Sequence, residues 1–93
     1  MTTLFIDNGI SINLDDYMED PIGKFERTPP MFVPKAVGER LAIAEFTGNV
    51  EKVVEIHRWW NANLKTERYL QASRSYNETW DGLRRANPNG WRG

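Results

Sequence analysis

The sequence contains no cysteine, and this absence excludes disulfide bonds, thiolate catalysis and every metal site that depends on cysteine. Its net charge of −1 leaves no overall excess of positive charge for a polyanion to bind. No apolar run approaches the roughly 18 residues that a membrane-spanning helix needs, and the first residues, MTTLFIDNG, lack the features of a signal peptide. We therefore expect a cytoplasmic protein that does not contact a membrane.

Residues that could support catalysis or hold a cofactor are also scarce. His57, the one histidine, lies on the apolar side of a predicted helix, where we expect a hydrogen-bonded core residue and not a base or a metal ligand. The acidic cluster in residues 15–20 does not have the spacing of a calcium-binding loop, and a solvated turn explains it better. The stretch from Gly38 to Gly48 lacks the Gly-Lys-Ser/Thr ending of a phosphate-binding loop. The sequence thus predicts a protein that is not an enzyme, with no cofactor and no metal.

The length of 93 residues fits one small domain with a thin core, since domains of this size bury roughly 60–65% of the surface that the unfolded chain exposes. We predict the α+β class, mainly α: an N-terminal β-hairpin, a proline-rich extended arm, an αα-hairpin and a longer C-terminal helix. The expected bounds are 1–19 for the β-hairpin, 20–34 for the arm, 35–86 for the helical region and 87–93 for a tail.

A β-hairpin is the strongest local prediction. Asn8-Gly9 supplies the two positive φ angles of a type I′ turn between two arms rich in β-formers. With these two residues as the loop, Phe5 should share a face with Ile10, Ile12 and Leu14. Leu4 and Ile6 should lie on the other face, opposite Ser11 and Asn13.

The arm that follows contains four of the five prolines within fifteen residues. Proline disfavours helices and central strands and favours extended backbone. The arm is nevertheless apolar, because it includes Phe25, Met31 and Phe32. We expect it to lie in a groove, either on its own domain or on a neighbouring molecule.

Two short helices come next. The first should span 35–46, with Val37, Leu41 and Ala44 on one side and Gly48 as its stop signal. Asn49 should cap the second helix. A connection this short predicts an antiparallel αα-hairpin.

Two adjacent tryptophans in the second helix should face in different directions. At about 100° per residue, Trp60 falls within the predicted apolar arc and Trp59 falls on the polar face. We therefore predict that Trp60 is a core residue and that Trp59 contacts the arm, the hairpin or another chain. The arc consists of Val50, Val53, Val54, His57, Trp60 and Leu64.

A second apolar stripe begins at Tyr69, out of phase with the first by about 130° if one straight helix is assumed. We predict a break at 63–66, with Thr66 as the cap of a third helix and Glu67 in its first turn. A single long helix that passes from its own core to a partner would produce the same phase slip. The stripe comprises Tyr69, Ala72, Ser73, Tyr76, Trp80 and Leu83.

The charge is distributed unequally along the chain. Residues 1–57 carry ten acids against five bases, or −5, and residues 58–93 carry seven bases against three acids, or +4. Two halves of opposite charge can pack against each other within one chain, or one half can pack against the other half of a second copy. The arginines and aromatics of the second half are also typical of nucleic-acid binding, but Arg74 and Arg85 share a helix face with Glu67 and Glu78, which dilutes the positive field.

These patterns predict a small non-enzymatic module that binds a protein partner or another copy of itself, such as an accessory, inhibitor or assembly component of the kind common in phages and bacteria. The alternative is a nucleic-acid-binding module that uses the basic, aromatic second half. The residues predicted to bind the partner are Phe25, Met31, Phe32, Arg58, Trp59, Trp91 and Arg92.

Overall fold

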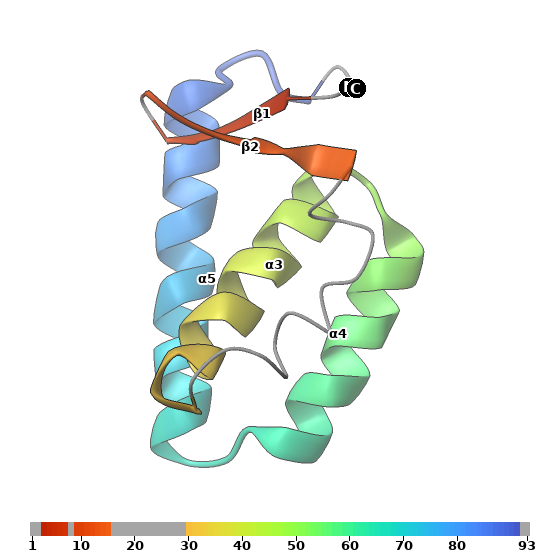
Figure 1. Cartoon of the computed structure of the whole chain (residues 1–93), viewed down its shortest axis with the longest axis vertical. Helices are drawn as coiled ribbons and strands as arrows, with labels where there is room; N and C mark the ends of the chain where they lie inside the picture. The colour runs from red at the N-terminus through yellow and green to blue at the C-terminus, as the bar shows by residue number, and fades with distance from the viewer. Residues whose placement is uncertain (1–2, 8, 16–29, 92–93) are drawn as a thin grey trace.

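A computed structural model describes residues 3–7, 9–15 and 30–91, and its order of elements is that of a mainly helical α+β fold (Figure 1). The hairpin lies across one end of the helices, and α3 lies between α5 and α4 in the view shown. The elements are β1 (Thr3–Asp7), β2 (Ile10–Asn13), the 3₁₀ helix η1 (Pro30–Phe32), α3 (Val33–Phe46), α4 (Val50–Asn63) and α5 (Glu67–Ala86).

The predicted hairpin is present, but its register differs from the prediction. The turn places Gly9 at a φ of 79° and pairs Asp7 with Ile10, as expected. An irregularity between Phe5 and Asp7 then shifts the ladder, so that Leu4 pairs with Ile12 and Phe5 with Ser11. The extra residue of a β-bulge moves every later side chain to the opposite face.

The shift decides which face of the hairpin is buried. Leu4 is fully buried with Leu14 against Ala42, Ile43 and Leu83 of the helices, and Ile12 packs at the edge of this cluster. Phe5 and Ile10, by contrast, are both about half exposed. The prediction that Phe5 faces the same side as Ile12 and Leu14 is therefore wrong.

The end of the predicted arm is helical and not extended. Pro30–Phe32 forms η1, and α3 begins at Val33, two residues earlier than predicted. Pro34 fits there because the first turn of a helix needs no N–H donor and proline already has a helical φ. Residues 20–29 of the predicted arm, Phe25 among them, lie outside the described residues.

The connection between α3 and α4 forms as predicted. Gly48 has a φ of 74°, and the amides of Gly48 and Asn49 donate to the carbonyls of Glu45 and Ala44 at 3.2 and 2.9 Å. This pair of bonds is the Schellman motif. The Asn49 side chain then accepts from the Lys52 amide at 3.2 Å and caps α4.

The backbones of helices α3 and α5 approach each other closely at Gly38. A Cβ on Gly38 would lie 2.2 Å from the Ala72 carbonyl oxygen and 2.8 Å from the Tyr76 amide nitrogen, so only glycine permits this approach. Beside it, the buried Ser75 hydroxyl donates to the Lys35 carbonyl at 2.7 Å. Gly82 has the same role against the hairpin, where an added Cβ would lie 2.4 Å from the Ile6 carbonyl oxygen.

Helix α4 buries a face that is rotated from the predicted arc. Trp60 is a core residue as predicted, 7% exposed, and it packs with Ile56 and Leu64. Val50 and Val54 are exposed, as is His57, whereas Ile56 was not assigned to the arc. Ile56, Trp60 and Leu64 form the line along which α4 packs against α3. This contact decides which face of α4 is buried.

The chain breaks between α4 and α5, as the change of phase predicted. Leu64 is extended, and Thr66 has a φ of 54°, an unusual value for a β-branched residue. Thr66 occupies the cap position, but its side chain makes no capping bond; its hydroxyl donates instead to the Lys65 carbonyl. The alternative of one continuous helix is therefore wrong.

Helix α5 presents its predicted stripe to the core. Ala72 and Leu83 are fully buried, Tyr76 and Trp80 are half-buried, and Tyr69 is 49% exposed. The helix ends at Ala86, and the Asn87 side chain donates to the Phe5 carbonyl of the hairpin at 2.7 Å. In the described part of the chain, no helix has the length and apolarity to cross a bilayer.

Candidate functional site

The residues predicted to bind a partner do not form one surface, as far as the structure describes them. Met31 and Phe32 lie in η1, directly before α3, and Arg58 and Trp59 lie on α4. Trp91 is half-buried against the cluster beneath the hairpin. Phe25 and Arg92 lie outside the described residues.

Met31 and Phe32 stand at one end of a groove between α3 and α5, here called the α3–α5 groove. Both are exposed, at 75% and 54%. Two adjoining hollows of about 340 and 250 Å³ form the groove, and Lys35, Ser75 and Glu78 line both. The remaining lining residues are Gln71 and Arg74 in the first hollow, with Ile6, Asp7, Ile10, Glu39 and Thr79 in the second.

The middle of the α3–α5 groove carries charges of both signs. Lys35 and Arg74 are the bases and Glu39 and Glu78 are acids. Burial raises the pKa of the Glu39 carboxyl group, an effect that the neighbouring Arg40 and Lys35 partly oppose. The groove therefore combines apolar side chains at its ends with a mixed-charge centre, and one of its lining residues, Ser75, bonds α5 to α3 through the Lys35 carbonyl.

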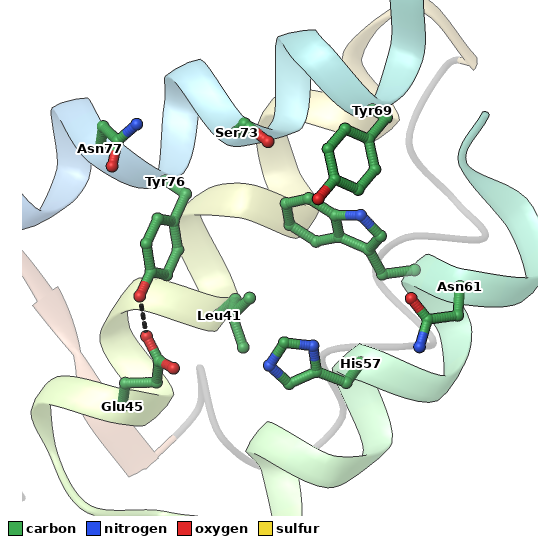
Figure 2. A pocket seen from close by; sticks show the side chains of 9 residues that line it. Leu41, Glu45, His57, Asn61, Tyr69, Ser73, Tyr76 and Asn77 are labelled. Carbon is green, nitrogen blue, oxygen red and sulfur yellow. Dashed lines mark hydrogen bonds between the residues drawn. The ribbon is translucent and has the colours of Figure 1, made fainter. Parts of the chain in front are cut away.

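A separate hollow, here called the helix pocket, is enclosed by side chains of α3, α4 and α5 (Figure 2). Its volume is about 380 Å³, within the usual range for small-ligand clefts. The pocket is lined by Leu41 and Glu45 of α3, His57, Trp60 and Asn61 of α4, and Tyr69, Ser73, Tyr76 and Asn77 of α5.

Glu45 is held in place by two donors from α5. One of its carboxylate oxygens accepts hydrogen bonds from the Tyr76 hydroxyl and, at 3.4 Å, from the Trp80 indole N–H. The other oxygen points towards the pocket in Figure 2. Burial raises the pKa of the Tyr76 hydroxyl, and the hydrogen bond to Glu45 adds to this, so Tyr76 remains a donor at neutral pH.

His57 belongs to the helix pocket and not to the core. The ring is exposed and points into the hollow, which contradicts the predicted buried, hydrogen-bonded histidine. Among the described residues, no hydrogen bond joins His57 to Glu45 or to Ser73, so the three do not form a nucleophile relay. Nor do the described residues include a group of three or more histidines and carboxylates able to hold a metal ion.

Arg58 and Trp59 line a further hollow of about 460 Å³ whose lining residues all belong to α4. Trp59 is half-buried and packs at the edge of the cluster around Trp60, so the prediction that it points away from the core is only partly correct. Its carbonyl accepts from the Asn63 side chain at 2.8 Å. Val54, which was assigned to the core, lies exposed in this hollow.

Several of these features were not predicted. The pairing of Glu45 with Tyr76 joins residues 31 positions apart, and local periodicity contains no information about it. Gly38 and Gly82 did offer a signal, since glycine inside a helix is costly unless another backbone approaches closely.

Comparison with known proteins finds no matching family model, no matching curated protein and no matching solved structure.

Proposed function

We propose that this protein is a small interaction module that acts by surface contact, without catalysis, and that the α3–α5 groove binds a segment of a protein partner or of a second copy. The observation that carries the proposal is the exposure of Met31 and Phe32, two large apolar side chains side by side at the groove's end. An intracellular location, indicated by the sequence, is part of the same proposal.

Burial of these two side chains would supply the favourable free energy. Fully burying a methionine or phenylalanine side chain is worth about 1.5–3 kcal/mol, and protein interfaces are enriched in both residue types and have a polar rim. Here Lys35, Arg74 and Glu78 provide that rim. A rim with positive and negative charges complements a partner surface that also carries charges of both signs. This favours a protein partner over a polyanion.

The alternative, nucleic-acid binding through the second half of the chain, has weaker support. Arg85 lies 3.4 Å from Asp7, and Arg84 lies 3.8 Å from Asp81 and over the Trp80 ring. These exposed pairs are weak, but each places a carboxylate beside an arginine, and Asp7 lowers the net charge of +4 in residues 58–93 to +3. Binding to heparin that weakens steeply with salt would favour the alternative.

The proposal is tested by a double substitution in the groove, Met31→Ser with Phe32→Ser. Serine suits position 32, which is the N-cap of α3, so the helix should be retained. Light scattering over a range of concentrations measures self-association, and quantitative affinity capture from the source cells compares the proteins retained by each variant. We expect the double variant to lose an association or a retained protein that the original sequence shows.

The matched control is Val50→Ser with Leu70→Ser, which removes two apolar side chains of similar exposure, 71% and 67%, outside every hollow described above. It should retain the association. A protein that stays monomeric at all concentrations and retains the same proteins with either double substitution would contradict the proposal.

A further inference from the structure

The helix pocket has a composition that differs from the α3–α5 groove, and among the described residues that line it Glu45 is the only one with a carboxylate. No lysine or arginine is among the residues that the structure places around it. One Glu45 oxygen is fixed by Tyr76 and Trp80, and the other is directed inwards. In the part of the chain that the structure describes, no lysine or arginine is paired with this carboxylate, so its charge favours a positive group in the pocket.

Aromatic rings add to the same preference. Trp60 and Tyr69 meet edge to face, with ring centroids 5.4 Å apart and planes at 82°, so the two rings form adjoining walls. Tyr76 lines the pocket beside Glu45. The faces of aromatic rings carry partial negative charge and attract ammonium and guanidinium groups that lie within about 6 Å.

Polar groups that accept hydrogen bonds complete the lining. Asn61 on α4 and Ser73 and Asn77 on α5 each contribute an oxygen that an N–H donor could reach. The volume of about 380 Å³ is much larger than a metal ion requires, and one carboxylate is too few to coordinate one. The pocket therefore suits an organic cation with several N–H groups or with methyl groups on nitrogen.

From this combination we infer that the helix pocket binds an organic cation, of the size of the charged end of an arginine side chain, between Glu45 and the rings of Trp60, Tyr69 and Tyr76. Such a cation could belong to a protein segment or to a free quaternary ammonium compound. The inference does not depend on the α3–α5 groove, because the helix pocket and the groove share no lining residue.

The test is a titration followed by ¹H–¹⁵N NMR, in phosphate buffer that contains no organic cation. The probes are arginine capped at both ends and its neutral isostere, capped citrulline. Capped arginine should shift the amides of residues that line the pocket and should bind at least about fivefold more tightly than citrulline. Equal binding of the two probes, or shifts that map elsewhere, would overturn the inference.

Two variants separate charge from structure. Glu45→Gln keeps an oxygen for the Tyr76 and Trp80 donors but removes the charge, and it should reduce the preference for arginine over citrulline to the part that the aromatic rings supply. Glu51→Gln removes a charge from the exposed side of α4, outside the helix pocket, and should preserve the preference. A preference that Glu45→Gln leaves undiminished would also overturn the inference.

A further arm of the titration distinguishes the two sources of the cation. Tighter binding of capped arginine than of choline assigns the pocket to a side chain of a protein. Tighter binding of choline assigns it to a free quaternary ammonium compound. Tyr69→Leu should weaken binding of the preferred cation, because it removes one of the aromatic rings. Unchanged binding would contradict the inferred contact between the cation and the Tyr69 ring.

Discussion

Helix α3 packs against α5 on one side and against α4 on the other, and the two contacts are built differently. Against α5 the backbones meet at Gly38, and the buried Ser75 hydroxyl bonds to the Lys35 carbonyl. Against α4 the contact depends on large side chains, chiefly Ile56, Trp60 and Leu64. The free space beside the α3–α5 contact is the groove described above, whereas the helix pocket is enclosed by side chains of all three helices.

This difference indicates how a small domain combines stability with binding surfaces. The α3–α5 contact, with the hairpin fixed over it at Gly82, forms the part of the fold that tolerates least change. Helix α4 is attached by fewer, larger side chains, and it exposes Val50, Val54 and His57. Substitutions on the two sides of α3 should therefore have different effects, and the predictions below test that difference.

The largest effect is expected for Trp60→Ala. Trp60 is 7% exposed and central to the α4 contact, and truncating a core tryptophan costs about 3–5 kcal/mol in the free energy of unfolding. Trp59→Ala, at the half-buried edge of the same cluster, should cost less than half as much. Thermal and chemical melts of both variants measure this. If Trp59→Ala proved the more damaging, the assigned face of α4 would be wrong.

Gly38→Ala tests the backbone contact on the other side of α3. The added methyl group would overlap the Ala72 carbonyl and the Tyr76 amide, and backbone atoms cannot rotate away as a side chain can. We expect a loss of at least about 2 kcal/mol, despite the gain of about 1 kcal/mol in helix propensity.

The matching substitution on α4 is Ala62→Leu, which adds a larger group at an exposed position. It should change stability by less than about 0.5 kcal/mol. Similar chemical denaturation midpoints for Gly38→Ala and the original protein would show that α3 and α5 are not in backbone contact.

A smaller effect is expected for Ser75→Ala. This substitution removes the 2.7 Å hydrogen bond to the Lys35 carbonyl in a buried position, which is worth about 1 kcal/mol. Ser73→Ala, a half-buried serine that lines the helix pocket, is the control and should be nearly neutral. Equal losses from the two substitutions would mean that the bond between α3 and α5 contributes nothing specific.

The smallest effect depends on pH and concerns Glu39. Folding raises the pKa of this carboxyl group above its ordinary value of 4.5, chiefly through burial, so the folded state binds more protons than the unfolded state above that pH. Stability from this group is therefore present in acid and is lost as pH rises through the folded-state pKa. Glu39→Gln should gain stability relative to the original protein as the pH rises from about 4 to 7.

The control for this prediction is Glu51→Gln, because the Glu51 side chain is exposed on α4. Denaturation midpoints of the three proteins across this pH range measure the relative gain. A constant difference between Glu39→Gln and the original protein at every pH would contradict the assigned burial of Glu39.

The sequence predicted those features of the fold that short segments determine alone. The turn at Gly9, the stop at Gly48 and the cap at Asn49 each depend on the φ preference or side chain of one residue. The break before α5 was visible because a change of phase cannot be accommodated in one straight helix.

The features that were missed depend on contacts between distant segments. The hairpin register is shifted by the irregularity next to Ile6, whose carbonyl lies against Gly82, 76 positions later. The face of α4 follows the line of contact with α3, so Ile56 is buried while Val50 is not. The exposure of Met31 and Phe32 agrees with the predicted surface role, but the groove beside them exists only because α5 returns along α3.

Native-state hydrogen exchange tests the contrast between the two sides of α3 most directly. Amides in the middle of α3 and in Ala72–Leu83 of α5 should exchange only through global unfolding, with the highest protection in the protein. Amides in the middle of α4 should exchange through a local opening that requires about 1–3 kcal/mol less. Equal protection of α4 and α5, with the same dependence on denaturant, would show that all three helices open as one unit and would contradict the account.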